Sequence, residues 1–251
     1  MKLTAKVPLK RSLLPQPSVV EESLSRRVAS EFGRVTVRPG FLLLHTLEFN
    51  EFTATCGVVA TRLPQDYLEN RASLSSWWKT ALDDLHDHIS HLDIEIETTG
   101  DSSITDLAVL LTHIVAVYLD HTDGLGVYWG DGVLNDAATF LELSEYVRKD
   151  ALQGILWVNV GAIAFDDGSI NLTTFGLADF DLHDLEIDRV STDDPGGIVG
   201  YVCGLIEQWF LGTVCLPNDK PIPAPENMTM RSVVGESWVR DGDLVIKLLL
   251  D

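Results

Sequence analysis

The residues best suited to metal chemistry are three histidines in a six-residue segment that aspartates flank. The group consists of His86, His88, His91, Asp83, Asp84 and Asp87. Imidazole and carboxylate groups ligate zinc, but they must converge on one point. On a helix, His86 and His88 would point about 200° apart. We therefore expect a solvated helix C-terminus, where histidine interacts favourably with the dipole. A metal-dependent hydrolase using the His86–His91 region remains the alternative.

Phosphate binding and nucleophilic catalysis have weaker support. Gly124, Gly126 and Gly130 resemble a phosphate loop, but they precede a predicted strand, open no helix and are not followed by a lysine. The chain has no Gly-x-Ser-x-Gly motif, and its sequence places none of the three cysteines beside a histidine. We expect no catalytic residue, no cofactor and no bound metal.

Acidic side chains between residues 166 and 194 are the first candidate for binding. The tract contains Asp166, Asp167, Asp179, Asp181, Asp184, Glu186, Asp188, Asp193 and Asp194, with Arg189 as its only base. It lacks the ligand register of an EF-hand. A solvated face would need no ligand, but self-repulsion of so many carboxylates destabilises a fold, which favours a surface kept for a basic partner. Phe165, Phe175 and Phe180 are candidate apolar anchors there, with burial in the core as the alternative.

A second candidate surface follows from the strict alternation between His91 and Glu97. The apolar positions are Leu92, Ile94 and Ile96, and the acidic positions are Asp93, Glu95 and Glu97. Alternation with a period of two predicts a half-buried strand with its three carboxylates on the outer face.

The overall charge also indicates a basic partner. Among 251 residues, 18 are basic and 38 acidic, which gives a net charge of −20. The first 40 residues carry +5, so the remaining chain carries −25. Such a body repels nucleic acid and anionic membranes and attracts a basic protein. Three cysteines and no long apolar run indicate a reduced, cytoplasmic protein.

The pattern of elements predicts an α+β fold, with helices packed on a mixed, largely antiparallel sheet in a single domain. Residues 1–40 are expected to form a basic, partly extended N-terminal arm, with a helix over 19–32, and residues 41–251 a single acidic domain. Further predictions are a hairpin over 41–61, helices over 75–88, 136–149 and 195–212, and a buried helix that starts at Ser103. Asp167-Gly168 predicts a second hairpin.

Three segments resemble the bacterial domain-of-unknown-function family numbered 4261. They are Gly126-Val127-Tyr128-Trp129-Gly130, Leu156-Trp157-Val158, and Thr173-Thr174-Phe175-Gly176-Leu177 followed by Leu185-Glu186-Ile187. The resemblance covers roughly residues 41–211. It implies an association with type VI secretion loci, where some members are immunity proteins that neutralise a co-encoded toxin. It supplies no catalytic residues.

Charge and resemblance together predict an immunity protein that covers the active surface of a cognate toxin and performs no chemistry of its own. The resemblance implies a toxin with a nuclease-like domain, whose basic substrate cleft would attract an acidic inhibitor. A metal-dependent hydrolase and a secretion-system adaptor are the alternatives. The expected contact residues are Asp93, Glu95, Glu97, Asp166, Asp167, Asp179, Phe180, Asp181, Asp184, Glu186 and Asp188.

Overall fold

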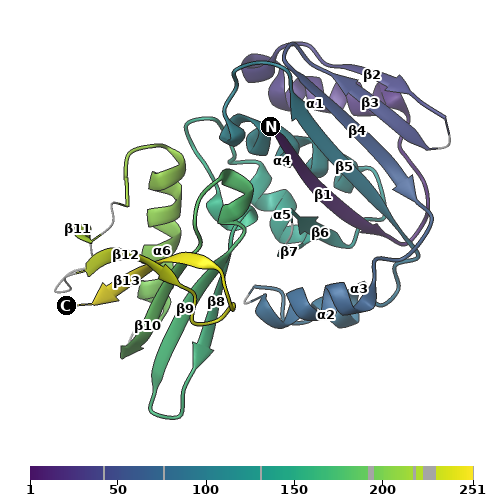
Figure 1. The fold of residues 1–251 in the computed structure, drawn as a ribbon. Coiled ribbons are helices and arrows are strands. Elements are labelled where there is room, and N and C mark those ends of the chain that lie inside the picture. Colours follow the sequence, from purple (N-terminus) through teal and green to yellow (C-terminus); the bar gives the residue numbers. More distant parts are fainter. Residues whose placement is uncertain are drawn as a thin grey trace.

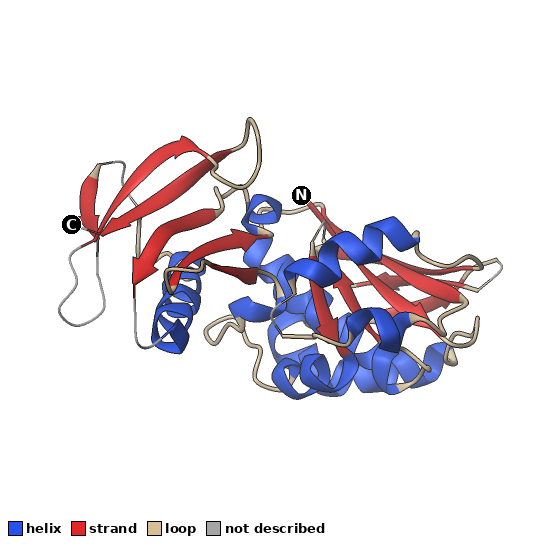
Figure 2. Ribbon diagram, turned by 90° about the horizontal axis from the view of Figure 1, so that it is seen from below, coloured by secondary structure: helices blue, strands red, loops and turns tan. Residues whose placement is uncertain are grey.

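The computed structural model contains two β-sheets that lie at opposite ends of the molecule (Figures 1 and 2). It describes residues 1–41, 43–75, 77–130, 132–191, 195–216, 219–222 and 230–250. The first sheet has the strand order β2-β3-β4-β5-β1-β6-β7, and the second has the order β11-β12-β13-β10-β9-β8. All described pairings are antiparallel except the parallel pair of β10 and β13. The predicted α+β fold in one domain is confirmed.

The first sheet is built from the N-terminal half of the chain. Its strands are β1 (Lys2–Leu9), β2 (Thr36–Pro39), β3 (Leu44–Glu48), β4 (Phe52–Val59), β5 (Ser90–Thr98), β6 (Gly126–Trp129) and β7 (Val133–Asp136). The inner face packs against α1 (Pro17–Phe32) and α4 (Ile104–Asp120), and α5 (Ala137–Ser144) packs against α4. On the outer face, α2 (Gln65–Leu74) and α3 (Ala81–Leu85) cover only the β6–β7 end.

The N-terminal segment is part of this sheet, so the prediction of a separate arm over residues 1–40 was wrong. Strand β1 lies between β5 and β6 and pairs with β5 along its whole length. Leu3, Ala5 and Val7 point into the core, while Lys2 and Lys6 point outward. The helix predicted over 19–32 is confirmed as α1. Burial of the alternate apolar residues explains why the segment is ordered.

Helix α4 is the central buried helix beneath the first sheet, as predicted. Its N-terminus carries a capping box in which the Ser103 hydroxyl accepts from the Asp106 amide and the Asp106 side chain accepts from the Ser103 amide. Every residue from Leu107 to Leu119 is buried. A helix that is apolar on all sides must be enclosed, and the first sheet, α1 and α5 enclose it.

The second sheet is formed mainly by the C-terminal part of the chain. Its strands are β8 (Asn159–Ala164), β9 (Ser169–Phe175), β10 (Leu185–Ser191), β11 (Lys220–Ile222), β12 (Met230–Glu236) and β13 (Leu244–Leu250), with α6 (Pro195–Phe210) and the short helices η1 (Gly154–Leu156) and η2 (Leu177–Phe180). The predicted hairpin forms, and Gly168 adopts the positive φ of 82° that its turn requires.

One apolar core joins the two sheets. Trp129 at the end of β6 stacks on Trp157, and Trp157 stacks on Phe180. The Trp157 indole also donates to Thr112 of α4 at 2.9 Å. Trp157 therefore contacts residues of the first sheet and α4 on one side and Phe180, beside the second sheet, on the other.

Two predicted helices are shorter in the structure. The segment predicted as one helix over 75–88 contains only α3, and the helix predicted to reach residue 149 ends at Ser144. Thr80 caps α3 without a side-chain hydrogen bond, and the Ser75 hydroxyl accepts from the Trp78 amide. Helical spacing of apolar residues did not distinguish a turn followed by a short helix from one continuous helix.

Candidate functional site

The histidine group does not form a metal site. His88 is 4% exposed, and its Nε2 accepts from the Leu63 amide at 2.9 Å while its Nδ1 contacts the Leu85 carbonyl at 2.6 Å. His91 Nδ1 contacts the Thr61 carbonyl at 2.8 Å. Within the described ranges, no three His, Cys, Asp or Glu side chains are grouped to hold a metal ion. Backbone groups engage both ring nitrogens of His88 and one of His91, whose Nε2 lies 3.5 Å from Asp93, so these two histidines hold loops in place.

The acidic tract divides into buried and exposed residues, which corrects the prediction of one binding face. Asp184 is 6% exposed and Glu186 is 1% exposed. Asp184 accepts from Arg240 Nη1 at 2.8 Å, from the Thr174 hydroxyl at 3.0 Å and from the Leu177 amide at 3.2 Å. These two carboxylates belong to the interior and cannot contact a partner.

Glu186 of β10 binds the loop that connects β12 to β13. It accepts a hydrogen bond from the Ser237 hydroxyl and another, at 2.9 Å, from the Trp238 amide. In the same connection, the Arg240 guanidinium lies 4.9 Å from the centre of the Phe175 ring. The connection therefore covers the start of the polar face of β10, at Glu186, and leaves Asp188 exposed.

Phe180 was also wrongly predicted as a surface anchor. It is 4% exposed, as is Phe175, and its ring lies 4.4 Å from that of Phe210. The remaining residues of the tract are Asp166, Asp167, Asp181 and Asp188, which are exposed, and Asp179, which is half-buried. Asp193 and Asp194 lie outside the described residues.

The carboxylates of β5 lie on the outer face of the first sheet, as predicted, but the N-terminal strand partly neutralises them. Lys6 Nζ lies 2.6 Å from Asp93, and Lys2 Nζ lies 2.6 Å from Glu95. Glu97 is exposed. These ion pairs are 30–54% exposed, so water screens them and each stabilises the fold only weakly.

Beside these carboxylates lies an open groove of about 350 Å³. Its walls come from the β2–β3 connection and the end of β4, and its lining includes Phe41, Leu43, Val59, Asp93 and Glu95. Phe41 is 83% exposed and Leu43 is 43% exposed. Apolar side chains this exposed beside charged ones are typical of a surface that a partner covers.

The backbone of this connection is strained. Leu43 has a φ of 58°, in the left-handed region that a leucine rarely adopts. Such a conformation costs roughly 1–3 kcal/mol and persists where the surroundings impose it, often at binding sites. The Leu43 carbonyl accepts from the Val58 amide at 3.1 Å, which holds the connection against β4.

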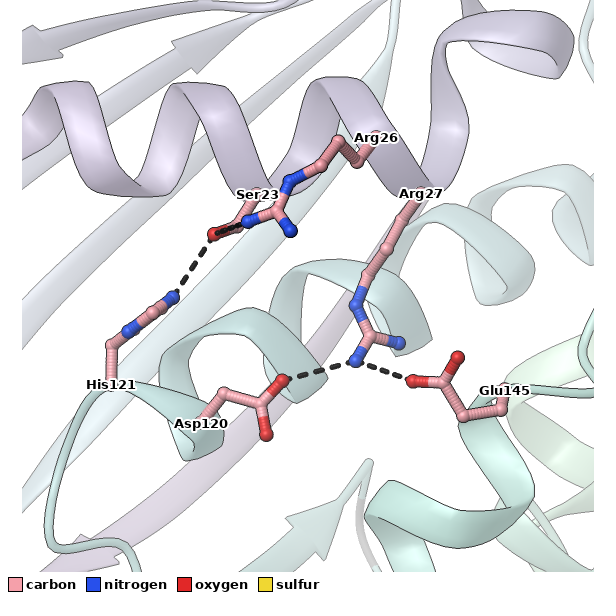
Figure 3. Close-up of a pocket in the computed structure, with 6 residues that line it drawn as sticks. All are labelled: Ser23, Arg26, Arg27, Asp120, His121 and Glu145. Atoms are coloured by element: carbon pink, nitrogen blue, oxygen red, sulfur yellow. Dashed lines mark hydrogen bonds and ion pairs between the residues drawn. The ribbon is translucent and has the colours of Figure 1, made fainter.

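A larger polar pocket of about 480 Å³ lies where the C-terminal ends of α4 and α5 meet the middle of α1 (Figure 3). Arg27 Nη2 lies 3.0 Å from Asp120 and 2.6 Å from Glu145. His121 Nε2 lies 3.0 Å from the Ser23 hydroxyl, which also accepts from Arg26 at 3.3 Å. Sequence reasoning missed this group because its members come from three helices that are far apart in the chain.

The Ser23–His121 contact has the geometry of a nucleophile and its base, but the surroundings do not favour catalysis. No carboxylate among the described residues bonds to the other ring nitrogen of His121, so nothing there orients the ring. The last carbonyls of α4 approach this position, and their dipoles oppose an oxyanion. The two carboxylates already hold Arg27. The side chains that line this pocket therefore connect the three helices to one another.

A buried cysteine also has a histidine neighbour. Cys56 of β4 pairs with His45 of β3, and the Tyr118 hydroxyl lies 2.8 Å from His45 Nδ1. Burial raises the pKa of the Cys56 thiol to about 12, and lowers the pKa of His45 below its ordinary value. A thiol that stays protonated is a poor nucleophile. The sequence placed no cysteine beside a histidine, because the hairpin over 41–61 was predicted without a register; the structure pairs these two residues.

Comparisons with models of known families, with curated proteins and with solved structures found no match. In the part of the chain that the structure describes, none of the helices has the length and apolar character needed to cross a bilayer.

Proposed function

We propose that this chain is a cytoplasmic immunity protein of a type VI secretion locus, which binds a cognate basic toxin and covers its active surface without chemistry of its own. The observation that carries the proposal is the exposed apolar pair Phe41 and Leu43 beside the carboxylates of β5. An acidic surface that binds tightly needs apolar anchors among its charges, because electrostatics sets association rate more than final affinity.

Phe41 and Leu43 supply these anchors on the outer face of the first sheet. Burying a large apolar side chain contributes roughly 1.5–3 kcal/mol. Asp93 and Glu95 form the other side of the groove. Because the ion pairs with Lys6 and Lys2 are solvent-screened, a partner's lysine or arginine can replace either ammonium at little cost.

The charge of the whole chain supports a nuclease-like toxin as the partner. A nuclease binds phosphates through a basic cleft, and a body of net charge −20 would be attracted to that cleft from a distance. A role without chemistry agrees with the engagement of His88 by backbone groups and with the protonated state of Cys56.

The test is a rescue experiment with a candidate toxin encoded beside this chain. We expect the neighbour to be toxic when it is expressed alone and harmless when it is expressed with this chain. Phe41→Ala should weaken binding by about 2 kcal/mol, roughly thirtyfold, because it removes the most exposed anchor. Isothermal titration calorimetry with the purified pair measures this loss.

Tyr146→Ala is the matched control, since Tyr146 is an exposed aromatic residue, at 63%, outside the groove. It should leave both rescue and affinity unchanged. A neighbour that is harmless by itself would overturn the immunity function. Equal affinities for the two variants would move the interface away from the β2–β3 connection.

A further inference from the structure

The strands at the ends of the two sheets differ in how their open edges are protected. Among the described residues, the end strands are β2 and β7 in the first sheet and β11 and β8 in the second. An open edge exposes backbone groups that can pair with another chain. Charged residues, proline or a covering element normally prevent such pairing.

Three of these end strands carry such protection. Strand β2 contains Arg38 and Pro39, and β11 contains Lys220 and Pro221. In β7, the residues from Val133 to Asn135 are buried, and α2 packs against the strand. None of these edges offers an open, uncharged row of backbone groups.

Strand β8 has none of these devices along its second half. Its sequence, Asn159-Val160-Gly161-Ala162-Ile163-Ala164, contains no charge and no proline. The first three residues are buried, but Ala162, Ile163 and Ala164 are all exposed, although alternate residues face opposite sides of the sheet. The distal half of β8 is therefore uncovered on both faces. Figure 1 shows the β8–β9 hairpin projecting beyond its neighbours.

The charges near this edge favour a basic occupant. Asp166 and Asp167 form the turn that follows β8, and Asp188 is exposed on β10, one strand farther from the edge than β9. Hydrogen bonds from the Ser169 hydroxyl and amide lower the pKa of Asp167, so it is charged at neutral pH. Arg189, which pairs with Asp167 at 3.1 Å, neutralises one of the three. A second copy of this chain, with its own net charge of −20, would be repelled.

We infer that the exposed half of β8, residues 162–164, is a strand-addition site that binds an extended, basic segment of another protein. The segment would continue the second sheet through backbone hydrogen bonds at residues 162–164, and its basic side chains would reach the acidic turn. This site is separate from the groove of the first sheet, and it does not depend on the immunity function.

The probe is a synthetic peptide in which valine alternates with lysine, added to the full-length protein. We expect it to bind and to slow amide hydrogen exchange in β8. Two matched peptides separate the contributions: methylation of alternate backbone nitrogens should abolish binding, and replacement of lysine by threonine should weaken it about tenfold. Fluorescence anisotropy measures the affinities.

Ile163→Lys should weaken binding of the basic peptide about tenfold, because it places a charge on the open edge. Leu244→Lys is the matched control: Leu244 is 54% exposed, but its strand β13 lies between β12 and β10. Equal binding by the methylated peptide, or equal loss in both variants, would overturn strand addition. If the wild-type protein self-associates and Ile163→Lys abolishes that association, the edge binds a second copy of this chain. That result would overturn the proposal of a basic partner.

Discussion

Strands β5 and β10 share a sequence pattern but have opposite surroundings. Both alternate apolar residues with carboxylates: β5 through Asp93 and Glu95, and the segment that enters β10 through Asp184, just before the strand, and Glu186 within it. In β5 the acidic face is open, and lysines of β1 lie beside it. At β10 the connection between β12 and β13 covers Asp184 and Glu186, while Asp188, farther along the strand, is exposed. Alternation therefore predicts which residues share a face, while a distant segment decides whether that face meets water.

The largest expected effect is a loss of stability when a covered carboxylate is removed. Asp184→Ala leaves the Arg240 guanidinium, the Thr174 hydroxyl and the Leu177 amide without their acceptor. We expect the free energy of unfolding to fall by about 3 kcal/mol. Urea denaturation followed by tryptophan fluorescence measures it. Asp166→Ala, at an exposed position in the same tract, should change stability by no more than about 0.5 kcal/mol; similar losses in both would remove the distinction between covered and open carboxylates.

The second largest expected effect is a loss of stability at acidic pH, which the buried side chain of His113 causes. Burial, with smaller contributions from the charges of Arg27 and Arg148, lowers the pKa of His113 in α4 to about 4. The unfolded chain therefore binds a proton at this residue below about pH 6.5 while the native protein does not. The free energy of unfolding should fall as pH drops from about 6.5 to 4, by about 3 kcal/mol in all.

Urea denaturation of the wild type and of His113→Leu at several pH values isolates this contribution, because the other titrating groups are common to both proteins. The variant should lose less stability between pH 6.5 and 4. Parallel pH profiles would show that His113 does not contribute.

The smallest effect is expected at the open carboxylates of β5. A double-mutant cycle with Lys6→Met and Asp93→Asn should give a coupling of about 0.5 kcal/mol, because this ion pair is screened by solvent. The four urea denaturation curves supply the cycle. A coupling near 2 kcal/mol would mean that the open pair resembles the covered one, and that a partner could not readily displace Lys6.

Local signals predicted much of the fold. The capping box at Ser103, the turn at Asp167-Gly168 and the alternation of β5 each depend on residues close in sequence, and all three are confirmed. The apolar residues of strand β1 also alternate, but Pro8, Pro15 and Pro17 favoured an extended arm. Its assignment depends on β5 and β6, whose sequences are far away.

The candidate site was less predictable for the same reason. The outward direction of Asp93 follows from local alternation, but its pairing with Lys6 requires β1 to lie beside β5. Burial of Asp184 requires Arg240, which is 56 residues away. The exposure of Phe41 contradicts its apolar character, and only the surroundings of the β2–β3 connection reveal it.

The central position of β1 has a consequence for synthesis on the ribosome. Lys6 leaves the exit tunnel first, yet its partner Asp93 follows 87 residues later, and the pairing with β6 must wait longer still. At roughly 5–20 residues per second, the strand stays unpaired for several seconds. In that interval Lys2 and Lys6, which alternate with the apolar residues of the strand, oppose aggregation of the unpaired segment.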